Sequence, residues 1–168
     1  MPTNTTLLTN WAAARVVGWS LALALLAAGL ATLVAALIPL RFGNIDSEVG
    51  ALGETAATGS LLLIGVAATL FVAAQTRRRG VVLGSALLSI GLAVVLIGGL
   101  LLLALDLPIV LRSAQGMAPV PARAVKVAVA KSLALLGIEV GALVALGFLG
   151  FRWWFASKRS SNKRVLAP

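Results

Sequence analysis

The chain has 168 residues, of which 60% are hydrophobic and only 11% are charged, and its mean hydropathy is +1.05. A soluble domain of this length needs a far more polar surface, so this composition indicates an integral membrane protein. The absence of Cys and His excludes thiolate nucleophiles, imidazole bases, zinc fingers and Cys-held iron–sulfur clusters. The formal net charge of +9 would suit a nucleic-acid-binding protein, but the positions of the charges favour another explanation.

Four stretches are long and apolar enough to cross about 30 Å of hydrocarbon, which takes about 20 helical residues. They cover residues 16–40, 55–76, 80–105 and 132–151. We therefore predict an all-α integral membrane fold, an up-down antiparallel bundle of four transmembrane helices. The helices are expected at about residues 12–40, 56–76, 80–105 and 121–157. Residues 1–158 would form one membrane domain, and residues 159–168 a basic flexible tail.

The first apolar stretch follows Arg15 and exceeds the apolar part of a signal peptide, usually about 7–15 residues. We expect an uncleaved first helix that ends near Pro39. Thr55 or Thr58 is a candidate cap for the second helix. The short "TRRRG" connection then requires the second and third helices to form an antiparallel hairpin.

The third connection contains three prolines that set the expected helix ends. "DLP" at residues 106–108 is expected to stop the third helix. The following "PIVLRSAQGM" is too short to span a membrane and is expected to lie in its interface. Pro121 suits the first position of the fourth helix.

The basic residues follow the positive-inside rule if both termini and the "TRRRG" turn are cytoplasmic. That side then carries no acid and the following basic residues: Arg15, Arg77, Arg78, Arg79, Arg152, Lys158, Arg159, Lys163 and Arg164. Such residues also attract anionic lipid headgroups, by about 1 kcal/mol each near the surface. Trp153 and Trp154 fit an interfacial aromatic belt better than a base-stacking platform, so we expect no nucleic-acid partner. The expected location is a bacterial inner membrane or a thylakoid membrane.

Small residues recur at four-residue spacing on two predicted helices. Gly80 and Gly84 form one pair, and Gly137, Gly141 and Ala145 form a longer stripe. Such stripes allow two helix backbones to approach closely in lipid. Two interpretations stay open, because the stripes suit packing within this chain and also docking of another subunit or a second copy.

Glu139 is the one acid inside an apolar stretch. It lies two residues from both Gly137 and Gly141, so it faces roughly away from the glycine stripe. A bare ion at the centre of a membrane helix costs roughly 2.5–3.5 kcal/mol, so we expect Glu139 to be protonated, paired or hydrated. Arg41, Arg112 or a hydroxyl of another helix are candidate partners. We favour a role in helix packing or partner contact; an ion site is the alternative.

The segments "RVVG", "LIPLRFGNIDSEVGALGE", "LLLIGVAATLF" and "LLLALDLPIVLRSA" follow one another between Arg15 and Arg112. In this order they resemble the cyanobacterial HpsJ-like (hormogonium polysaccharide-associated) membrane proteins. The chain departs from that pattern at Glu48, where a Trp is usual, and at Gly59–Ser60, where a Pro is usual. The resemblance implies an accessory membrane protein linked to exopolysaccharide production or export, and it carries over no catalytic residue.

These observations predict a non-catalytic accessory or structural subunit of a bacterial membrane complex that acts through helix–helix contacts. Neither an enzyme activity nor a cofactor or metal is expected, because reactive side chains are scarce. Two alternatives stay open. One is a small transporter or channel that uses Glu139, and the other is a small subunit of a photosynthetic or other energy-transducing membrane complex.

Overall fold

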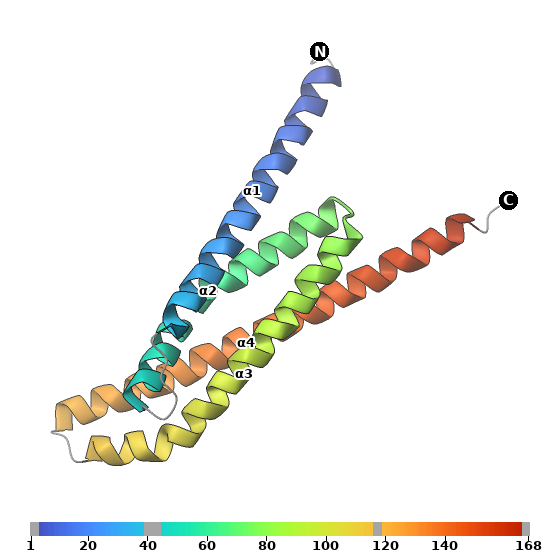
Figure 1. Ribbon diagram of the computed structural model, residues 1–168. Helices are drawn as coiled ribbons and strands as arrows, with labels where there is room; N and C mark the ends of the chain where they lie inside the picture. The colour runs from blue at the N-terminus through green and yellow to red at the C-terminus, as the bar shows by residue number, and fades with distance from the viewer. Residues whose placement is uncertain (1–3, 39–44, 116–118, 166–168) are drawn as a thin grey trace.

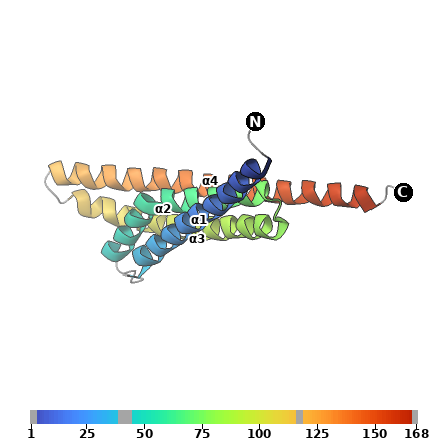
Figure 2. The same ribbon diagram turned by 90° about the horizontal axis from the view of Figure 1, so that it is seen from above.

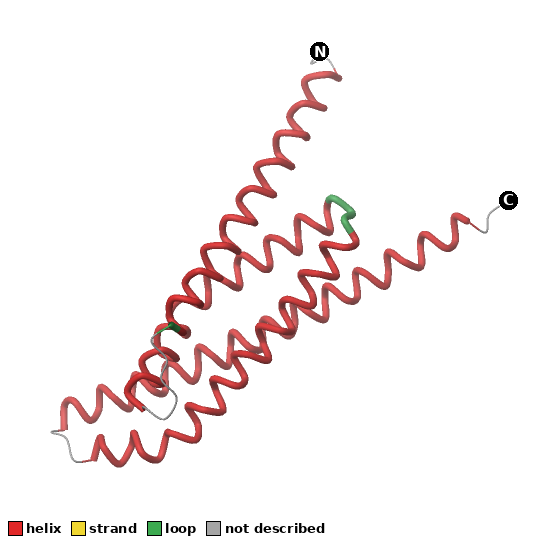
Figure 3. The backbone as a smooth tube through the Cα atoms, in the orientation of Figure 1, coloured by secondary structure: helices red, strands yellow, loops and turns green. Residues whose placement is uncertain are grey.

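The computed structural model describes residues 4–38, 45–115 and 119–165. These residues form long helices joined by short connections (Figure 3). The helices are α1 (Asn4–Leu37), α2 (Ile45–Gln75), α3 (Arg79–Gln115) and α4 (Pro119–Val165). Each contains a segment long and apolar enough to cross a membrane, namely Ala13–Leu37, Gly53–Gln75, Arg79–Arg112 and Ala122–Ser157. The predicted all-α class and the four candidate spans are therefore confirmed.

α2 begins earlier than the sequence suggested. Thr55 and Thr58 lie inside the helix, so the prediction that one of them caps it is wrong. Their hydroxyl groups donate to the carbonyl oxygens of Ala51 and Glu54, at 2.8 Å and 2.9 Å. Bonding to the carbonyl four residues back satisfies a hydroxyl within its own helix, so these threonines are compatible with an apolar surrounding. The predicted end of the first helix, Pro39, lies outside the described residues.

α3 continues through Pro108, so the prediction that "DLP" ends this helix is wrong. In Figure 1 the last, yellow part of α3 runs in a different direction from the green part. Proline removes one backbone hydrogen bond and crowds the carbonyl four residues back, which bends a helix more often than it stops one inside a bilayer. The segment "PIVLRSAQ" is consequently the final, bent part of α3.

α4 begins at Pro119, two residues before the predicted start at Pro121, and extends to Val165. Its 47 residues correspond to about 70 Å at about 1.5 Å per residue, more than a bilayer core requires. Figure 2 shows it as a long straight rod that projects past the other helices toward the C-terminus. The predicted flexible tail is therefore helical as far as Val165.

The helices do not all share one core. α2, α3 and α4 contact one another, whereas the described part of α1 contacts α2 alone. Figure 1 shows α1 diverging from the other helices toward the N-terminus. The arrangement is therefore three mutually packed helices with α1 attached to the outside of α2.

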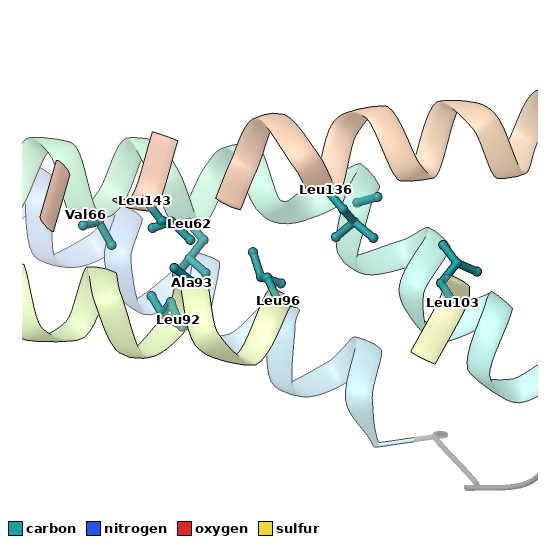
Figure 4. Packing of buried hydrophobic residues seen from close by; sticks show 9 residues of the cluster. Leu62, Val66, Leu92, Ala93, Leu96, Leu103, Leu136 and Leu143 are labelled. Carbon is teal, nitrogen blue, oxygen red and sulfur yellow. The ribbon is translucent and has the colours of Figure 1, made fainter. Parts of the chain in front are cut away.

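The main cluster of buried apolar side chains comes from α2, α3 and α4, whose residues point toward one another in Figure 4. It comprises Ala56, Leu62, Val66, Leu92, Ala93, Leu96, Leu103, Leu136 and Leu143. Leucines of α1, Leu26, Leu30 and Leu33, pack against its edge. A second, smaller cluster of Leu70, Ala73 and Val82 lies toward the α2–α3 connection, with Trp19 and Trp154 packed against it.

The α2–α3 connection is a tight turn made by Arg77. The backbone N–H of Arg78 donates to the Ala73 carbonyl at 3.0 Å, and that of Arg77 donates to the Ala74 carbonyl at 3.1 Å. This pattern is the helix cap that usually places glycine in the left-handed conformation. Here Arg77 adopts it, with φ of 54°.

Arg77→Gly is expected to stabilise the protein by about 1 kcal/mol, because glycine adopts the left-handed conformation without the steric cost that a side chain adds. Arg78→Gly is the matched control, since it removes the same charge next to the turn at a residue without positive φ. Thermal unfolding of both variants in the same detergent, followed by circular dichroism, measures the difference. Equal losses of stability in the two variants would contradict the assignment of strain to Arg77.

A buried carboxyl between three helices

Glu139 lies on the face of α4 that points into the core. Its neighbours on that face, Leu136 and Leu143, are three residues before and four residues after it, and both belong to the main cluster. Residues at these spacings lie on one side of a helix, so Glu139 faces the same core as the two leucines. Only 4% of the residue is exposed.

The carboxyl group rests against Gly59 of α2. A Cβ atom at Gly59 would overlap the carboxyl carbon and both carboxyl oxygens of Glu139. The missing side chain of Gly59 thus provides the space that the acid occupies. Thr55 lies one turn earlier on α2 and is also buried, but its hydroxyl hydrogen is already donated to the Ala51 carbonyl.

The buried carboxyl has no compensating partner among the residues described. Its Oε2 atom has no hydrogen-bond partner. Of the predicted partners, Arg112 is exposed, Arg41 lies outside the described residues, and no hydroxyl of another described helix bonds to Oε2. A buried charge without a partner is expensive, so this pocket suits the neutral acid rather than the carboxylate. Ser89 Oγ on α3 is a second buried polar atom without a hydrogen-bond partner.

The small residues singled out from the sequence do not pack inside this chain. A Cβ atom at Gly80, Gly84, Gly137 or Gly141 would meet no neighbouring atom within 4 Å, and Ala145 is exposed. The interpretation that these residues pack helices within this chain is therefore wrong for the monomer. Docking of another subunit stays a prediction for both stripes.

Other glycines, which have no glycine four residues away, make the close helix contacts. At Gly29 of α1, a Cβ atom would lie 2.6 Å from the Cα of Leu62 on α2. At Gly65 of α2, it would lie 2.6 Å from the backbone nitrogen of Leu26 on α1. These two glycines face each other's helices and allow the two backbones to approach closely. Each stands alone in an apolar run, so no spacing pattern marked it.

Two further glycines join α4 to α3. A Cβ atom at Gly147 would lie 2.5 Å from Ile90 Cδ1, and one at Gly150 would lie 2.7 Å from Ala86 Cβ. The segment "GFLG" places them three residues apart, a spacing that also puts two residues on one helix face. On α3 both glycines meet the same place, because the Ala86 carbonyl oxygen lies 3.5 Å from the Cβ position of Gly147 and Ala86 is fully buried.

The basic residues assigned to membrane orientation are exposed where the structure describes their side chains, namely at Arg15, Arg77, Arg78, Arg79 and Arg152. The side chains of Lys158 and Arg159 lie outside the described residues. Figure 1 shows the α2–α3 turn at the same end of the molecule as the two termini. The three arginines of this turn, Arg77, Arg78 and Arg79, thus lie at the end of the molecule toward which both termini extend.

Comparisons with protein-family models, with curated proteins and with solved structures find no match. Membership of the HpsJ-like family consequently stays a prediction. The exposed small-residue faces and the buried carboxyl are the features of this chain that point to a function.

Proposed function

We propose that this protein is a non-catalytic subunit of a bacterial membrane complex that binds other membrane helices through two exposed faces. The first, the α3 glycine face, consists of Gly84, Gly91 and Gly98. The second, the α4 small-residue face, consists of Gly137, Gly141 and Ala145. The partner is either another membrane protein or a second copy of this chain.

The observation that supports this proposal is the contrast between two groups of glycines. Gly29, Gly65, Gly147 and Gly150 each let another helix of the same chain approach closely. The glycines of the two faces are exposed and meet nothing, so within the monomer they only cost helix stability. A partner helix would give them the packing role that glycines have in membranes.

The spacing of the α3 glycine face also defines the crossing that a partner would adopt. Its glycines are seven residues apart, and Leu87, Val94 and Leu101 lie between and beyond them on the same side, all exposed. A seven-residue repeat is the pattern of a left-handed helix pair. A partner helix is therefore expected to run nearly along α3 over most of its length.

The proposed orientation places both termini and the Arg77–Arg79 turn in the cytoplasm, with four spans that alternate in direction. The positive-inside rule supports this orientation, because it places the exposed basic residues near the turn on the cytoplasmic side of the membrane. These side chains would also hold anionic lipid headgroups. The proposed location is an inner or thylakoid membrane, and exopolysaccharide export is the setting to test first, because the family resemblance points to it.

Cross-linking tests the docking faces directly, because the chain contains no native Cys. Gly91→Cys and Gly141→Cys, each alone, are expected to form disulfide-linked or bifunctionally cross-linked adducts in native membranes. Mass spectrometry of the adduct separates a second copy from a different subunit. Ile64→Cys on the exposed side of α2 is the control and should give little adduct. Adducts absent from both faces, or equally abundant at Ile64, would rule out docking through these surfaces.

Transport through Glu139 is a second candidate, favoured by the burial of a single acid among apolar side chains. Purified protein in liposomes should then show proton or cation flux that Glu139→Gln abolishes. Equal flux from the wild type and Glu139→Gln, or none from either, would exclude transport.

A further inference from the structure

The Glu139 pocket lies where α2, α3 and α4 meet. Apolar members of the main cluster come from all three helices near Glu139 and Gly59. They are Ala56 and Leu62 of α2, Leu96 of α3, and Leu136 and Leu143 of α4. Gly59 completes the pocket and lies directly against the carboxyl. Among the residues described, Glu139 is thus the one buried ionisable group, and the other buried polar residues carry only Ser or Thr hydroxyls.

Among the side chains that the structure describes, no charged group faces this acid from the helices packed around it. The described titratable residues are Glu54 on α2, Arg79, Asp106 and Arg112 on α3, and Arg123, Lys126, Lys131 and Arg152 on α4. All are exposed apart from Asp106, which is half-buried, and Oε2 of Glu139 has no hydrogen-bond partner among them. The carboxyl therefore lacks the counter-ion that a buried carboxylate needs.

The pocket also lacks the oxygen atoms that a metal cation would need. Hard cations such as Ca²⁺ take six to eight oxygen ligands. Within the described residues, no three acidic, His or Cys side chains gather in one place. On α2 before Gly59, the hydroxyls of Thr58 and Thr55 donate to carbonyl oxygens of their own helix, those of Glu54 and Ala51. A proton needs only the carboxyl itself, so it is the ligand that this chemistry fits.

We propose that the pocket formed by Glu139 and Gly59 is a proton-binding site, and that loss of the proton separates α4 from α2 at this level. The acid gives its proton to water and becomes a carboxylate, which requires hydration. Because the carboxyl already fills the space that a Cβ at Gly59 would take, and Oε2 is buried, a water has no room between Oε2 and α2 while the helices stay packed. The site thus links proton binding to the contact between the two helices, independently of the docking faces.

Infrared spectroscopy tests the protonation state, whether or not the pocket opens. The difference spectrum between the wild type and Glu139→Gln at neutral pH should contain the C=O band of a neutral carboxylic acid. Glu54→Gln, which changes an exposed acid on α2, is the matched control and should lack this band in its own difference spectrum. A carboxylate band in place of the acid band for Glu139 would overturn the proposal.

Distance measurement tests the linkage to helix packing. Spin labels on Ile64→Cys of α2 and Ile138→Cys of α4 occupy exposed positions outside the core. The labelled protein is diluted with unlabelled protein, so that only distances within one chain are measured. The distance between the two labels is expected to increase, and its distribution to broaden, at alkaline pH. The same labels on a Glu139→Gln background should keep the short distance at every pH, and circular dichroism checks that this variant is folded.

Three results would refute the linkage. One is a distance that does not respond to pH in the wild type, and another is a response that persists in Glu139→Gln. The third is a short distance restored at alkaline pH by Na⁺ or K⁺, which would assign the pocket to a cation instead of a proton.

Discussion

Gly65→Ala is expected to detach α1 from the rest of the molecule. The added Cβ atom would lie 2.6 Å from the backbone nitrogen and 2.7 Å from the Cα of Leu26. Both are backbone atoms, so no side chain can rotate away and the two helices must separate. Overpacking of this kind typically costs about 1–3 kcal/mol, and α1 has no described contact with α3 or α4 to hold it in place.

A disulfide provides the measurement. A Cβ atom at Gly18 would lie 3.6 Å from Val72 Cγ2, which brings cysteines at these positions close to disulfide geometry. The pair Gly18→Cys and Val72→Cys should form its disulfide efficiently when no other residue is changed. Adding Gly65→Ala should lower the disulfide yield, and adding Gly29→Ala should lower it in the same way. Gly53→Ala on the same helix, where a Cβ would meet nothing within 4 Å, should leave the yield unchanged. Efficient oxidation in all variants would show that the close contact is unimportant.

The second large effect is expected at Gly59 and depends on Glu139. Gly59→Ala places a methyl group in the space of the buried carboxyl, and we expect a loss of roughly 1–3 kcal/mol of stability. In a Glu139→Ala background the same methyl group has room, so Gly59→Ala should cost much less. Residues in direct contact commonly show a coupling of about 0.5–3 kcal/mol in such a cycle.

Unfolding of the four proteins in mixed micelles with increasing SDS measures this coupling. Gly147→Ala is the matched control, because its Cβ would meet Ile90 while lying eight residues, or about 12 Å, along α4 from Glu139. It should destabilise the protein and combine additively with Glu139→Ala. If Gly59→Ala is equally additive, the carboxyl does not occupy the space at Gly59.

The class of protein and the number of candidate spans follow from the sequence alone. A bilayer sets a minimum length for an apolar helix, so long uncharged stretches are recognisable without knowledge of their neighbours. Helical geometry also placed Glu139 away from the stripe of Gly137 and Gly141, and in the structure the acid is buried while these two glycines are exposed. Both results depend only on the period and length of one helix.

The helix ends were harder to predict, because backbone rules learned in water are weaker in lipid. Pro108 bends α3 where it was expected to stop it, and Thr55 lies within α2 where it was expected to cap it. Without competing water, a helix keeps its backbone hydrogen bonds across residues that would end it at a protein surface. The helices are accordingly longer than predicted.

Only the tertiary structure decided which small residues pack and where α1 lies. Lipid is as apolar as a leucine side chain, so both the buried and the exposed faces of these helices are hydrophobic, and the apolar pattern does not separate them. The four-residue spacing marked Gly84 and not Gly65, yet Gly65 touches the backbone of α1 and Gly84 touches nothing within 4 Å. The difference arises from the depth and rotation of each helix against its neighbours. Those are properties of helix pairs, and they also bring Gly59 of one helix against Glu139 of another.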